Sequence, residues 1–416
     1  MPQAYDVIVI GAGIAGVSTA MHLLMRGDKV LLLDRGAAGQ ETSYGNAGVI
    51  GTHYVLPFDA PSLVDIPKIL LNRDPSVHFH YRDLLACTPW IIDYYLRSFP
   101  KWREADGWRL RPLTKSAIDE HRTLMRHTEA ERHLSAAGNV KLHRSESSFA
   151  KSAFELAVAE RMGVPFEVLD AAAFGAMEPH LKPAYSKAVR WVGGMRLTNP
   201  GAVVAAYADR FAREGGVFQQ EEAQSLSQMP DGLWRLDLPS GTVAARHVVV
   251  CAGPWSGDYV KRLGYHFPLA MKRGYHRHFK AEGGATLAHA LTDADNGYVI
   301  CPMEQGYRLT TGAEFADLHA PPTPVQIDQI LPYARQLFAL GDTVDSAAWM
   351  GSRPCFTDSL PVIGAAPRHR GLWFNFGHGH MGLTIGPGSG RLLAEMIKGE
   401  PPFCDPHPYR AERLRF

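Results

Sequence analysis

The sequence is poor in cysteine, and its few cysteines are not arranged for cross-linking or for metal binding. There are 5 cysteines in 416 residues, an odd number with wide spacing, and none of them forms a C-x-x-C pair. Disulfide frameworks and zinc sites both show closely patterned cysteines. The sequence therefore indicates neither, and it predicts no metal site. The cysteines are Cys87, Cys251, Cys301, Cys355 and Cys404.

An excess of charge of one sign is also absent. Lys and Arg total 43 against 42 for Asp and Glu, so the formal net charge is +1. Without a basic surplus there is no general electrostatic case for binding nucleic acid or an anionic membrane. We find no run of about 20 apolar residues, which a spanning helix would need. The N-terminus starts a strand almost at once, so we expect no cleavable targeting segment. We expect a cytoplasmic protein, and we leave open a peripheral contact with the inner face of the cytoplasmic membrane.

Glycine, by contrast, is abundant, with 40 residues. Close approach of the backbone to a large ligand is one use of such an excess. Hydrophobic residues make up 46% of the chain and charged residues 20%, which is ordinary for a globular protein with a sizeable core. At roughly 100–200 residues per domain, the length indicates two or three domains.

The first 34 residues read as a strand, a helix and a second strand. Residues 5–10 (YDVIVI) form a short β-branched run typical of a buried strand, residues 14–26 have the composition of a packed helix, and residues 29–34 (KVLLLD) repeat the strand pattern. Two strands joined by a helix form a βαβ unit, which belongs to a parallel sheet.

Further elements follow with clear boundaries. Residues 200–214 predict an amphipathic helix, with Pro near its start and two glycines after its end. Residues 265–313 alternate strand-like runs with turn residues, which is typical of an antiparallel sheet. The remaining predictions are aromatic-rich helical spacing at 88–99, strands at 233–238, 243–251, 360–364 and 372–377, and helices near 325–340 and 389–399.

Gly11, Gly13 and Gly16 give a G-x-G-x-x-G pattern directly after the first strand. The first glycine permits the tight turn, the second lets a pyrophosphate approach the backbone, and the third lets the helix pack on the strand. The start of the helix offers free N–H groups to the phosphates. Asp34 ends the second strand, where a carboxylate accepts hydrogen bonds from ribose hydroxyls and repels a 2′-phosphate. This disfavours NADP, but it leaves NAD and FAD undecided.

Three later segments favour FAD. Residues 41–48 (ETSYGNAG) follow the second strand closely, residues 248–256 (VVVCAGPWS) form another strand and turn, and residues 377–390 (GHGHMGLTIGPGSG) form a second Gly-rich turn before the last helix. A flavin ring lies far from its adenine and needs its own backbone donors, which an NAD dehydrogenase would not need.

These segments resemble the glycine oxidase / D-amino-acid oxidase superfamily, and most of all its bacterial D-amino-acid dehydrogenases. The resemblance covers nearly the whole chain. Its most specific parts are R-P-x-x-x-D-x-x-P-x-I-G from Arg353 and the G-H-G-x-x-G that begins at Gly377. The longer insert at 52–135 favours the dehydrogenase branch over glycine and sarcosine oxidases.

The resemblance implies an α/β fold with a Rossmann-like FAD-binding domain assembled from discontinuous segments, and an α+β substrate domain with an antiparallel sheet. We expect the FAD-binding domain at 1–85, 196–262 and 351–416, and the substrate-binding domain at 86–195 and 263–350. Bound FAD is expected to be non-covalent. The expected cofactor contacts are Gly11, Gly13, Ile14, Ala15, Gly16, Asp34, Arg35, Ser43, Asn46, Ala47, Gly48, Val49, Ala252, Gly253, Trp255, Gly379, Met381, Gly382, Leu383 and Thr384.

The chemistry implied is oxidation of an amine carbon by hydride transfer from Cα to flavin N5, with the protein holding the substrate. Arg353 is the expected carboxylate clamp, because a guanidinium is planar, bidentate and always charged; a surface arginine or a structural ion pair is the alternative. Tyr298 resembles a tyrosine that closes the pocket over the flavin, and an ordinary core aromatic is its alternative.

Two pairs of residues are weaker candidates for the same site. His378 matches the family's G-H-G and is expected near the flavin, where it would stabilise charge on the reduced ring. His380 stands where the family suggests threonine, and it is a candidate for a contact with the substrate or the electron acceptor. His53 and Tyr54 follow the SYGNAG turn and are expected to reach the pocket from the other side. The alternative for the histidines is packing, and nothing else in the sequence supports a metal there.

Cys355 lies near the place where some sarcosine oxidases attach flavin through a cysteine. Alignment on Asp358 puts that cysteine further upstream, so the attachment is not expected here. No dedicated base is expected either, because the substrate amine can lose its proton to solvent before hydride leaves.

The resemblance implies a D-amino acid or a cyclic D-imino acid, such as D-proline or hydroxy-D-proline, as substrate. The electron acceptor stays open between oxygen and a quinone or dye. Alternatives are an enzyme of secondary amines (sarcosine, glycine or an opine), an aromatic-ring monooxygenase, and the FAD subunit of a larger amine dehydrogenase. Oligomeric state is not indicated.

Overall fold

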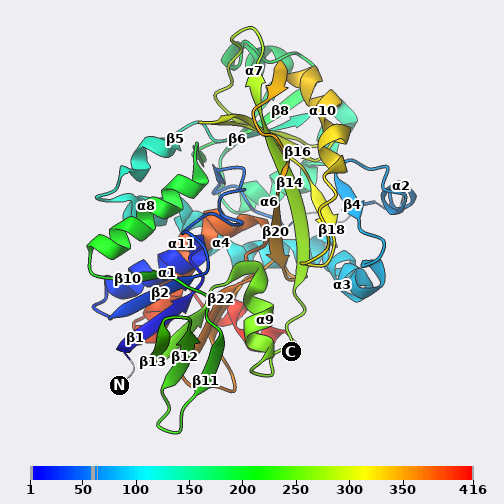
Figure 1. Ribbon diagram of the computed structural model, residues 1–416. Coiled ribbons are helices and arrows are strands. Elements are labelled where there is room, and N and C mark those ends of the chain that lie inside the picture. The colour runs from blue at the N-terminus through cyan, green and yellow to red at the C-terminus, as the bar shows by residue number, and fades with distance from the viewer. Residues whose placement is uncertain (1–2, 58–60, 63, 415–416) are drawn as a thin grey trace.

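The computed structural model describes residues 3–57, 61–62 and 64–414 and builds them around two large sheets. One sheet has eight strands and the other has eleven; in Figure 1 the eleven-stranded sheet lies above the eight-stranded one. A small sheet of three short strands also forms. Its strands are β3 (Val49–Ile50), β9 (Met195–Leu197) and β5 (Leu134–Ser135).

The eight-stranded sheet has the buried apolar strand β1 near its centre. β1 pairs in parallel with β2 on one side and with β13 on the other. Val7, Ile8 and Val9 are fully buried, as expected for a strand that is covered on both faces. The predicted βαβ unit is confirmed. The strands are β10 (Val217–Gln220), β2 (Val30–Asp34), β1 (Gln3–Ile10), β13 (Gly241–Val250), β12 (Trp234–Leu238) and β11 (Ser225–Gln228) in spatial order, with β22 (Leu372–Phe376) beside β13 and β21 (Val362–Ala365) beside β22.

Four helices build the hydrophobic layer on one face of this sheet: α1 (Ile14–Leu24), α4 (Pro100–Met125), α8 (Pro200–Arg213) and α11 (Gly382–Lys398). The predicted helix at 200–214 is confirmed as α8. Segments distant in the sequence thus share one core, because α1 packs on both α8 and α11, and α11 packs on α4.

The Gly-rich segment before the last helix differs from the prediction. It was expected to be a turn up to residue 390, but the helix α11 already begins at Gly382. The glycines allow close packing between helices instead. A Cβ atom on Gly390 would lie 2.7 Å from the backbone nitrogen of Thr19 in α1, and one on Gly388 would lie 3.1 Å from the hydroxyl of Ser116 in α4. Part of the glycine excess therefore serves helix packing.

The eleven-stranded sheet carries the long strand β14 and is mostly antiparallel, as predicted for 265–313. Helix α10 (Val325–Leu337) covers one face of the sheet (Figure 1). Its Ile330 packs in a buried hydrophobic cluster that also contains Leu309. The strands are β4 (Val77–Phe79), β18 (Ala313–Phe315), β14 (Ala270–Ala281), β17 (Gly306–Thr310), β16 (Tyr298–Met303), β15 (Ala290–Asp293), β6 (Asn139–His143), β8 (Lys187–Trp191) and β7 (Phe166–Asp170) in order, with β19 (Leu340–Thr343) and β20 (Trp349–Cys355) also on β14.

Three elements lie outside the segments predicted for them. Strands β4 and β20 belong to the eleven-stranded sheet, although residues up to 85 and from 351 were expected in the FAD-binding domain. Helix α4 was expected in the substrate-binding domain, yet Leu110, Leu113 and Ala117 pack in the core that α1 and α11 share. The reason lies in pairing between distant segments: β4 pairs in parallel with β18, β20 pairs antiparallel with β14, and α4 carries an apolar face that α11 covers.

The remaining helices lie around the two sheets. Helices α2 (Ile66–Leu70) and α3 (Leu84–Arg97) stand beside β4 and β18 (Figure 1), and α3 corresponds to the predicted aromatic-rich stretch. The others are α5 (Glu146–Ala150), α6 (Ala153–Arg161), α7 (Ala171–Met177) and α9 (Ser256–Lys261). Among the described residues, none of the helices combines the length and the apolar character needed to cross a membrane.

Candidate active site

The turn after β1 brings the three fingerprint glycines together as predicted. Gly11 has φ +106°, and a Cβ atom on Gly16 would lie 1.7 Å from the carbonyl oxygen of Gly11. Gly11 therefore makes the tight turn possible, and Gly16 lets helix α1 pack closely against that turn. At Gly13 the Ser43 hydroxyl lies 3.4 Å from a Cβ position, and among the described residues no other atom outside the adjoining backbone comes within 4 Å. The start of α1 is thus open at the point where a phosphate group would approach it.

Asp34 and Ser43 hold this turn from two sides. The N–H of Ala12 donates to Asp34 Oδ2 at 2.6 Å, and the N–H of Ile14 donates to the Ser43 hydroxyl at 3.0 Å. Both Asp34 oxygens are engaged, because Oδ1 accepts from the N–H of Gly36 at 2.9 Å. A carboxylate has about four acceptor sites, so Asp34 keeps capacity for a ribose hydroxyl.

The segment 41–48 is fixed by an arginine that sequence reasoning missed. Arg308 donates through Nη1 to the carbonyl oxygens of Tyr44 at 2.8 Å and Asn46 at 2.5 Å. Asn46 in turn accepts the N–H of Gly48 through its side chain at 2.8 Å. Burial lowers the pKa of Arg308. An isolated arginine in a strand gives no sequence signal that it holds a distant loop.

Two further segments complete the frame. The Arg35 guanidinium lies over the Trp255 ring, 4.1 Å from its centroid, and joins the end of β2 to the turn after β13. At the start of α11, the Leu383 carbonyl accepts a hydrogen bond from His121 Nε2 at 2.8 Å. Thr384 donates its hydroxyl to the Val49 carbonyl at 3.2 Å. Three segments far apart in sequence are thereby held around one space.

That space is a cavity of about 1130 Å³. Four of the expected contacts do not line the cavity but pack against residues near its wall. Gly16 packs on Gly11, Gly48 packs on Leu197, Met381 is buried, and Thr384 donates a hydrogen bond to Val49. The other expected cofactor contacts line the cavity: Gly11, Gly13, Ile14, Ala15, Asp34, Arg35, Ser43, Asn46, Ala47, Val49, Ala252, Gly253, Trp255, Gly379, Gly382 and Leu383.

Arg353 projects into the cavity from β20. It donates through Nη1 to the Gly312 carbonyl at 2.7 Å and through Nη2 to the Thr311 carbonyl at 3.5 Å. No carboxylate of a described residue forms an ion pair with Arg353. Within the described residues, Arg353 is therefore not part of a structural ion pair. Desolvation lowers its pKa, and a half-buried cation without an anion leaves charge available for a ligand.

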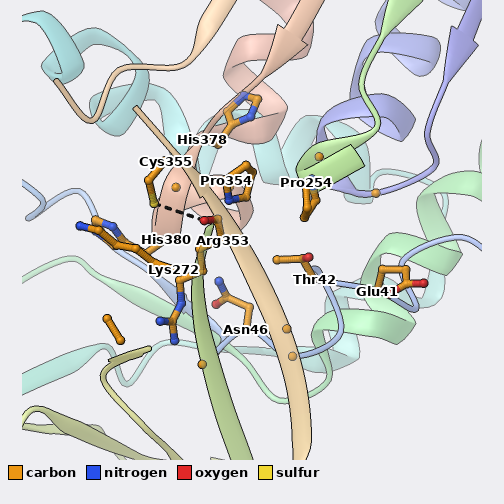
Figure 2. A pocket seen from close by; sticks show the side chains of 18 of the residues that line it. Glu41, Thr42, Asn46, Pro254, Lys272, Arg353, Pro354, Cys355, His378 and His380 are labelled. Atoms are coloured by element: carbon orange, nitrogen blue, oxygen red, sulfur yellow. Dashed lines mark hydrogen bonds between the residues drawn. The ribbon is translucent and has the colours of Figure 1, made fainter. Parts of the chain in front are cut away.

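His378 and His380 also line the cavity (Figure 2). Burial lowers the pKa of His378 to about 4, and its Nε2 lies 2.9 Å from the Ser389 hydroxyl. Burial, together with the positive charges of Lys272 and Arg353, lowers the pKa of His380 to about 3. Both imidazoles are therefore neutral at ordinary pH and offer hydrogen bonds rather than positive charge.

Two candidate side chains are placed away from the role expected of them. His53 does not reach the cavity, because its ring is stacked between Trp191 and Tyr54, with centroids 5.2 and 4.6 Å away. Tyr298 borders the cavity, but its side chain packs in the cluster under α10 and its hydroxyl accepts from Arg144 at 3.2 Å. In an antiparallel strand successive side chains alternate between faces, and this register turns Tyr298 toward the helix.

Tyr54 does line the cavity, where its ring meets His380 edge to face at a centroid distance of 5.6 Å. Its pKa is raised to about 12 by burial, so the hydroxyl stays protonated.

A second cation lies at the Arg353 end of the cavity, Lys272 on β14, and it was not predicted from the sequence. It lines the cavity beside Arg353, Cys355 and His380 on one side, while Glu41, Thr42 and Pro254 lie on the other (Figure 2). The aromatic-rich helix α3 contributes Ile91, Tyr94 and Tyr95 to the wall. A lysine within an alternating strand gives no signal by itself, and only the pairing of β14 with β20 brings it next to Arg353.

The cavity has the features that a dinucleotide flavin requires. It is larger than the typical pocket of about 300–1,000 Å³ for a small ligand, and it links the open start of α1 to the second Gly-rich turn. Asp34 stands at the end where an adenosine ribose would lie, and the neutral histidines and Arg353 stand at the other. The residues present therefore fit FAD.

Comparison with known proteins agrees with this geometry. The family model described as FAD dependent oxidoreductase matches residues 6–396. A D-amino-acid oxidase of Bradyrhizobium diazoefficiens is 30% identical over 423 residues, covering 100% of both chains. A D-amino acid dehydrogenase of Cereibacter sphaeroides is 31% identical over 428 residues, covering 95% of this chain and 92% of the relative. The crystal structure of glycine oxidase from Geobacillus kaustophilus, at 22% identity, superposes with a TM-score of 0.76 over 98% of each chain, which supports the fold.

Proposed function

The chain belongs to the family of FAD dependent oxidoreductases and uses FAD, and on that premise we propose that it carries out the oxidative deamination or dehydrogenation of a D-amino acid or a cyclic D-imino acid. The names of the two relatives support this class of substrate. The observation that carries the proposal is Arg353, a half-buried cation in the cavity with no carboxylate partner among the described side chains.

Arg353 would bind the substrate carboxylate. Hydrogen bonds to charged partners contribute roughly 1.5–3 kcal/mol each, and a guanidinium fixes orientation by its planar fork. With the carboxylate fixed at β20, only one hand of the substrate directs its Cα–H bond toward the cofactor. Bound FAD supplies the acceptor for the hydride that leaves Cα. D-proline and hydroxy-D-proline are included because the wall formed by α3 is apolar.

The frame of the cavity would hold the cofactor. The open start of α1 and Gly13 would face the pyrophosphate, Asp34 the ribose, and the turn at 377–384 the flavin end. Cys355 is buried, and burial raises the pKa of its thiol, which keeps it from acting as a thiolate nucleophile. We therefore propose non-covalent FAD.

The test is anaerobic reduction of the yellow holoenzyme. D-amino acids, cyclic D-imino acids, their L-forms, sarcosine and glycine are mixed with it separately, and loss of the oxidised flavin absorbance is followed. Bleaching by D-substrates alone supports the proposal. Bleaching only by sarcosine, glycine or an L-form contradicts it.

Arg353→Met provides the matched test of the clamp. We expect the substrate concentration for half-maximal bleaching to rise by about tenfold or more, since each 1.4 kcal/mol corresponds to a factor of ten. Arg246→Met is the control, because Arg246 is 72% exposed and does not line the cavity. Admitting air after reduction identifies the acceptor: peroxide formed in proportion to substrate assigns oxygen, and its absence assigns a quinone or dye.

A further inference from the structure

We propose that the substrate carries a second acidic group, which Lys272 binds, so that the preferred substrate is an acidic D-amino acid of the aspartate or glutamate type. This inference rests on the proposed function and narrows it to one class of side chain. It depends on the position of Lys272, on its surroundings and on the direction of the neighbouring Arg353.

Lys272 and Arg353 lie directly opposite each other in the ladder between β14 and β20. Directly opposite residues of an antiparallel pair project from the same face with Cβ atoms about 5 Å apart, and like charges there destabilise the sheet. Both side chains line the cavity, next to Cys355 and His380 (Figure 2). Two cations at one position of a sheet are unfavourable unless an anion is bound between or beside them.

The ammonium group of Lys272 is enclosed by aromatic rings. Its Nζ atom lies 3.7 Å from the centroid of Tyr94, 5.1 Å from that of Trp90 and 5.6 Å from that of Phe315. The π faces of the rings attract the cation. They do not replace the oxygen acceptors to which its N–H groups would otherwise donate. Within residues 3–57, 61–62 and 64–414, no hydrogen bond or ion pair engages this ammonium. The cage holds the charge in place and leaves its donors for a ligand.

The two charged groups point in different directions. The guanidinium of Arg353 bonds the Thr311 and Gly312 carbonyls and lies against Gly274, two residues further along β14. The ammonium of Lys272 is turned instead toward helix α3 and Tyr94. This arrangement favours two separate anionic groups of one ligand over a single carboxylate shared by both cations.

No acidic side chain of the described cavity lining compensates these charges. The acidic residues that line the cavity lie at the end of β2, in the following loop, after β10 and in α9, on the nucleotide side. They are Asp34, Glu41, Glu221, Glu222 and Asp258. The substrate end is therefore positive, and a dianionic ligand complements it better than a neutral one.

The first measurement needs no turnover. Glutarate and its monoanionic analogue butyrate are titrated separately into the oxidised holoenzyme, and the flavin absorbance reports binding. We expect glutarate to bind at least about tenfold more tightly, a difference that one charge-assisted hydrogen bond supplies. Equal affinity for the two anions overturns the inference.

The second measurement compares kcat/KM for D-glutamate with D-glutamine, which has the same shape without the charge. We expect the ratio to exceed about ten in the unchanged enzyme, to fall by about tenfold in Lys272→Met, mainly through KM, and to recover in Lys272→Arg. Lys101→Met is the control, because Lys101 also lies over a ring, Trp102 at 5.6 Å, but does not line the cavity. A ratio unchanged in Lys272→Met, or a ratio below one in the unchanged enzyme, overturns the inference.

The outcomes separate the two proposals. If glutarate is preferred through Lys272 but no D-amino acid bleaches the flavin, the proposed function fails while dianion binding stands. If D-alanine and D-proline bleach it and glutarate has no advantage, the proposed function stands and this inference fails. Iminodiacetate, whose second carboxylate is attached through nitrogen, is run beside D-glutamate, and faster bleaching by iminodiacetate overturns the assignment to an acidic side chain.

Discussion

The guanidinium of Arg353 occupies the space that a side chain on Gly274 would fill. Its Nη2 atom lies 2.2 Å from the point where a Cβ atom of Gly274 would stand, and its Cζ atom lies 2.7 Å away. Gly274 belongs to the middle of β14, where the backbone conformation suits any residue. The glycine is therefore explained by the arginine beside it rather than by a turn.

Gly274→Ala should displace the guanidinium and leave the fold intact, because the atoms in the way belong to the end of a flexible side chain. We expect KM for the amino-acid substrate to rise by about tenfold, with little change in FAD content, since one or two charge-assisted hydrogen bonds are misplaced. Steady-state kinetics and the flavin-to-protein absorbance ratio measure this. Gly257→Ala is the control, because among the described residues nothing outside its own helical turn lies within 4 Å of its Cβ position. An unchanged KM in Gly274→Ala would show that Arg353 does not contact the substrate carboxylate.

Asp34→Asn should weaken FAD binding. The carboxylate accepts the N–H of Ala12 at 2.6 Å and that of Gly36 at 2.9 Å, so the change disturbs the glycine turn as well as the ribose contact. An amide oxygen keeps one acceptor without the charge, and we expect the Kd for FAD to rise by about tenfold to 100-fold. Equilibrium dialysis of the apoprotein with FAD checks it, with the exposed Asp209→Asn as control. Equal Kd values for the two variants would contradict the role of Asp34.

The local features of the fold could be predicted from the sequence because they depend on short-range patterns. The βαβ unit, the turn at Gly11 and the helix from Pro200 follow from apolar periodicity and from glycine and proline at element ends. Arg353 could be proposed because it opens a specific motif. Such signals lie within a few residues of the feature that they predict.

The rest depends on contacts between distant segments. Lys272 faces the cavity only because β14 pairs with β20, and Arg308 holds the 41–48 segment across more than 260 residues. The orientation of Tyr298 depends on which face of its strand α10 covers, which alternation alone cannot assign. The extent of α11 was underestimated because glycines usually end helices, whereas here they let two helices approach.

Buried neutral histidines should make the protein sensitive to acid. Burial lowers the pKa of His121 to about 4, although its bond to the Leu383 carbonyl acts in the opposite direction. In the unfolded chain a histidine has a pKa near 6.5, so between these values the unfolded state binds more protons. The stabilisation is complete above about pH 6.5 and is lost as the pH falls toward 4, which amounts to about 2 kcal/mol at pH 5.

Denaturant unfolding of the holoenzyme at pH 8 and pH 5 measures this loss for His121. In His121→Gln the difference in the free energy of unfolding between the two pH values should shrink by about 2 kcal/mol. The exposed His266→Gln should leave it unchanged. If both variants show the same pH dependence as the unchanged protein, His121 is not held neutral in the folded state.

Cys355 should not carry the flavin. It is buried with its thiol pKa raised by burial, and its Sγ atom lies 3.4 Å from the carbonyl oxygen of Arg353. After precipitation with trichloroacetic acid we expect all of the yellow colour in the supernatant. Cys355→Ser should bind the same amount of FAD as the unchanged protein. Colour that remains in the pellet, and that disappears from it in Cys355→Ser, would establish a covalent bond instead.

The rate of flavin reduction should rise with pH through the ionisation of the substrate amine. An ammonium has no lone pair to stabilise the imine that forms as hydride leaves, so the amine must first lose its proton. Three neighbouring side chains have pKa values moved away from neutral pH. The pKa of His380 is lowered to about 3 and that of His378 to about 4, by burial first, while burial raises that of Tyr54 to about 12.

The second-order rate constant for anaerobic reduction should therefore increase about tenfold per pH unit below one ionisation and then become constant. His380→Asn should leave the pH of that ionisation unchanged, because the imidazole is already neutral throughout. A different substrate whose amine has a lower intrinsic pKa should move the ionisation down by the same difference. A profile that is flat from pH 6 to 10, or an ionisation that moves by about one unit in His380→Asn and not with the substrate, would place the titrating group on the protein.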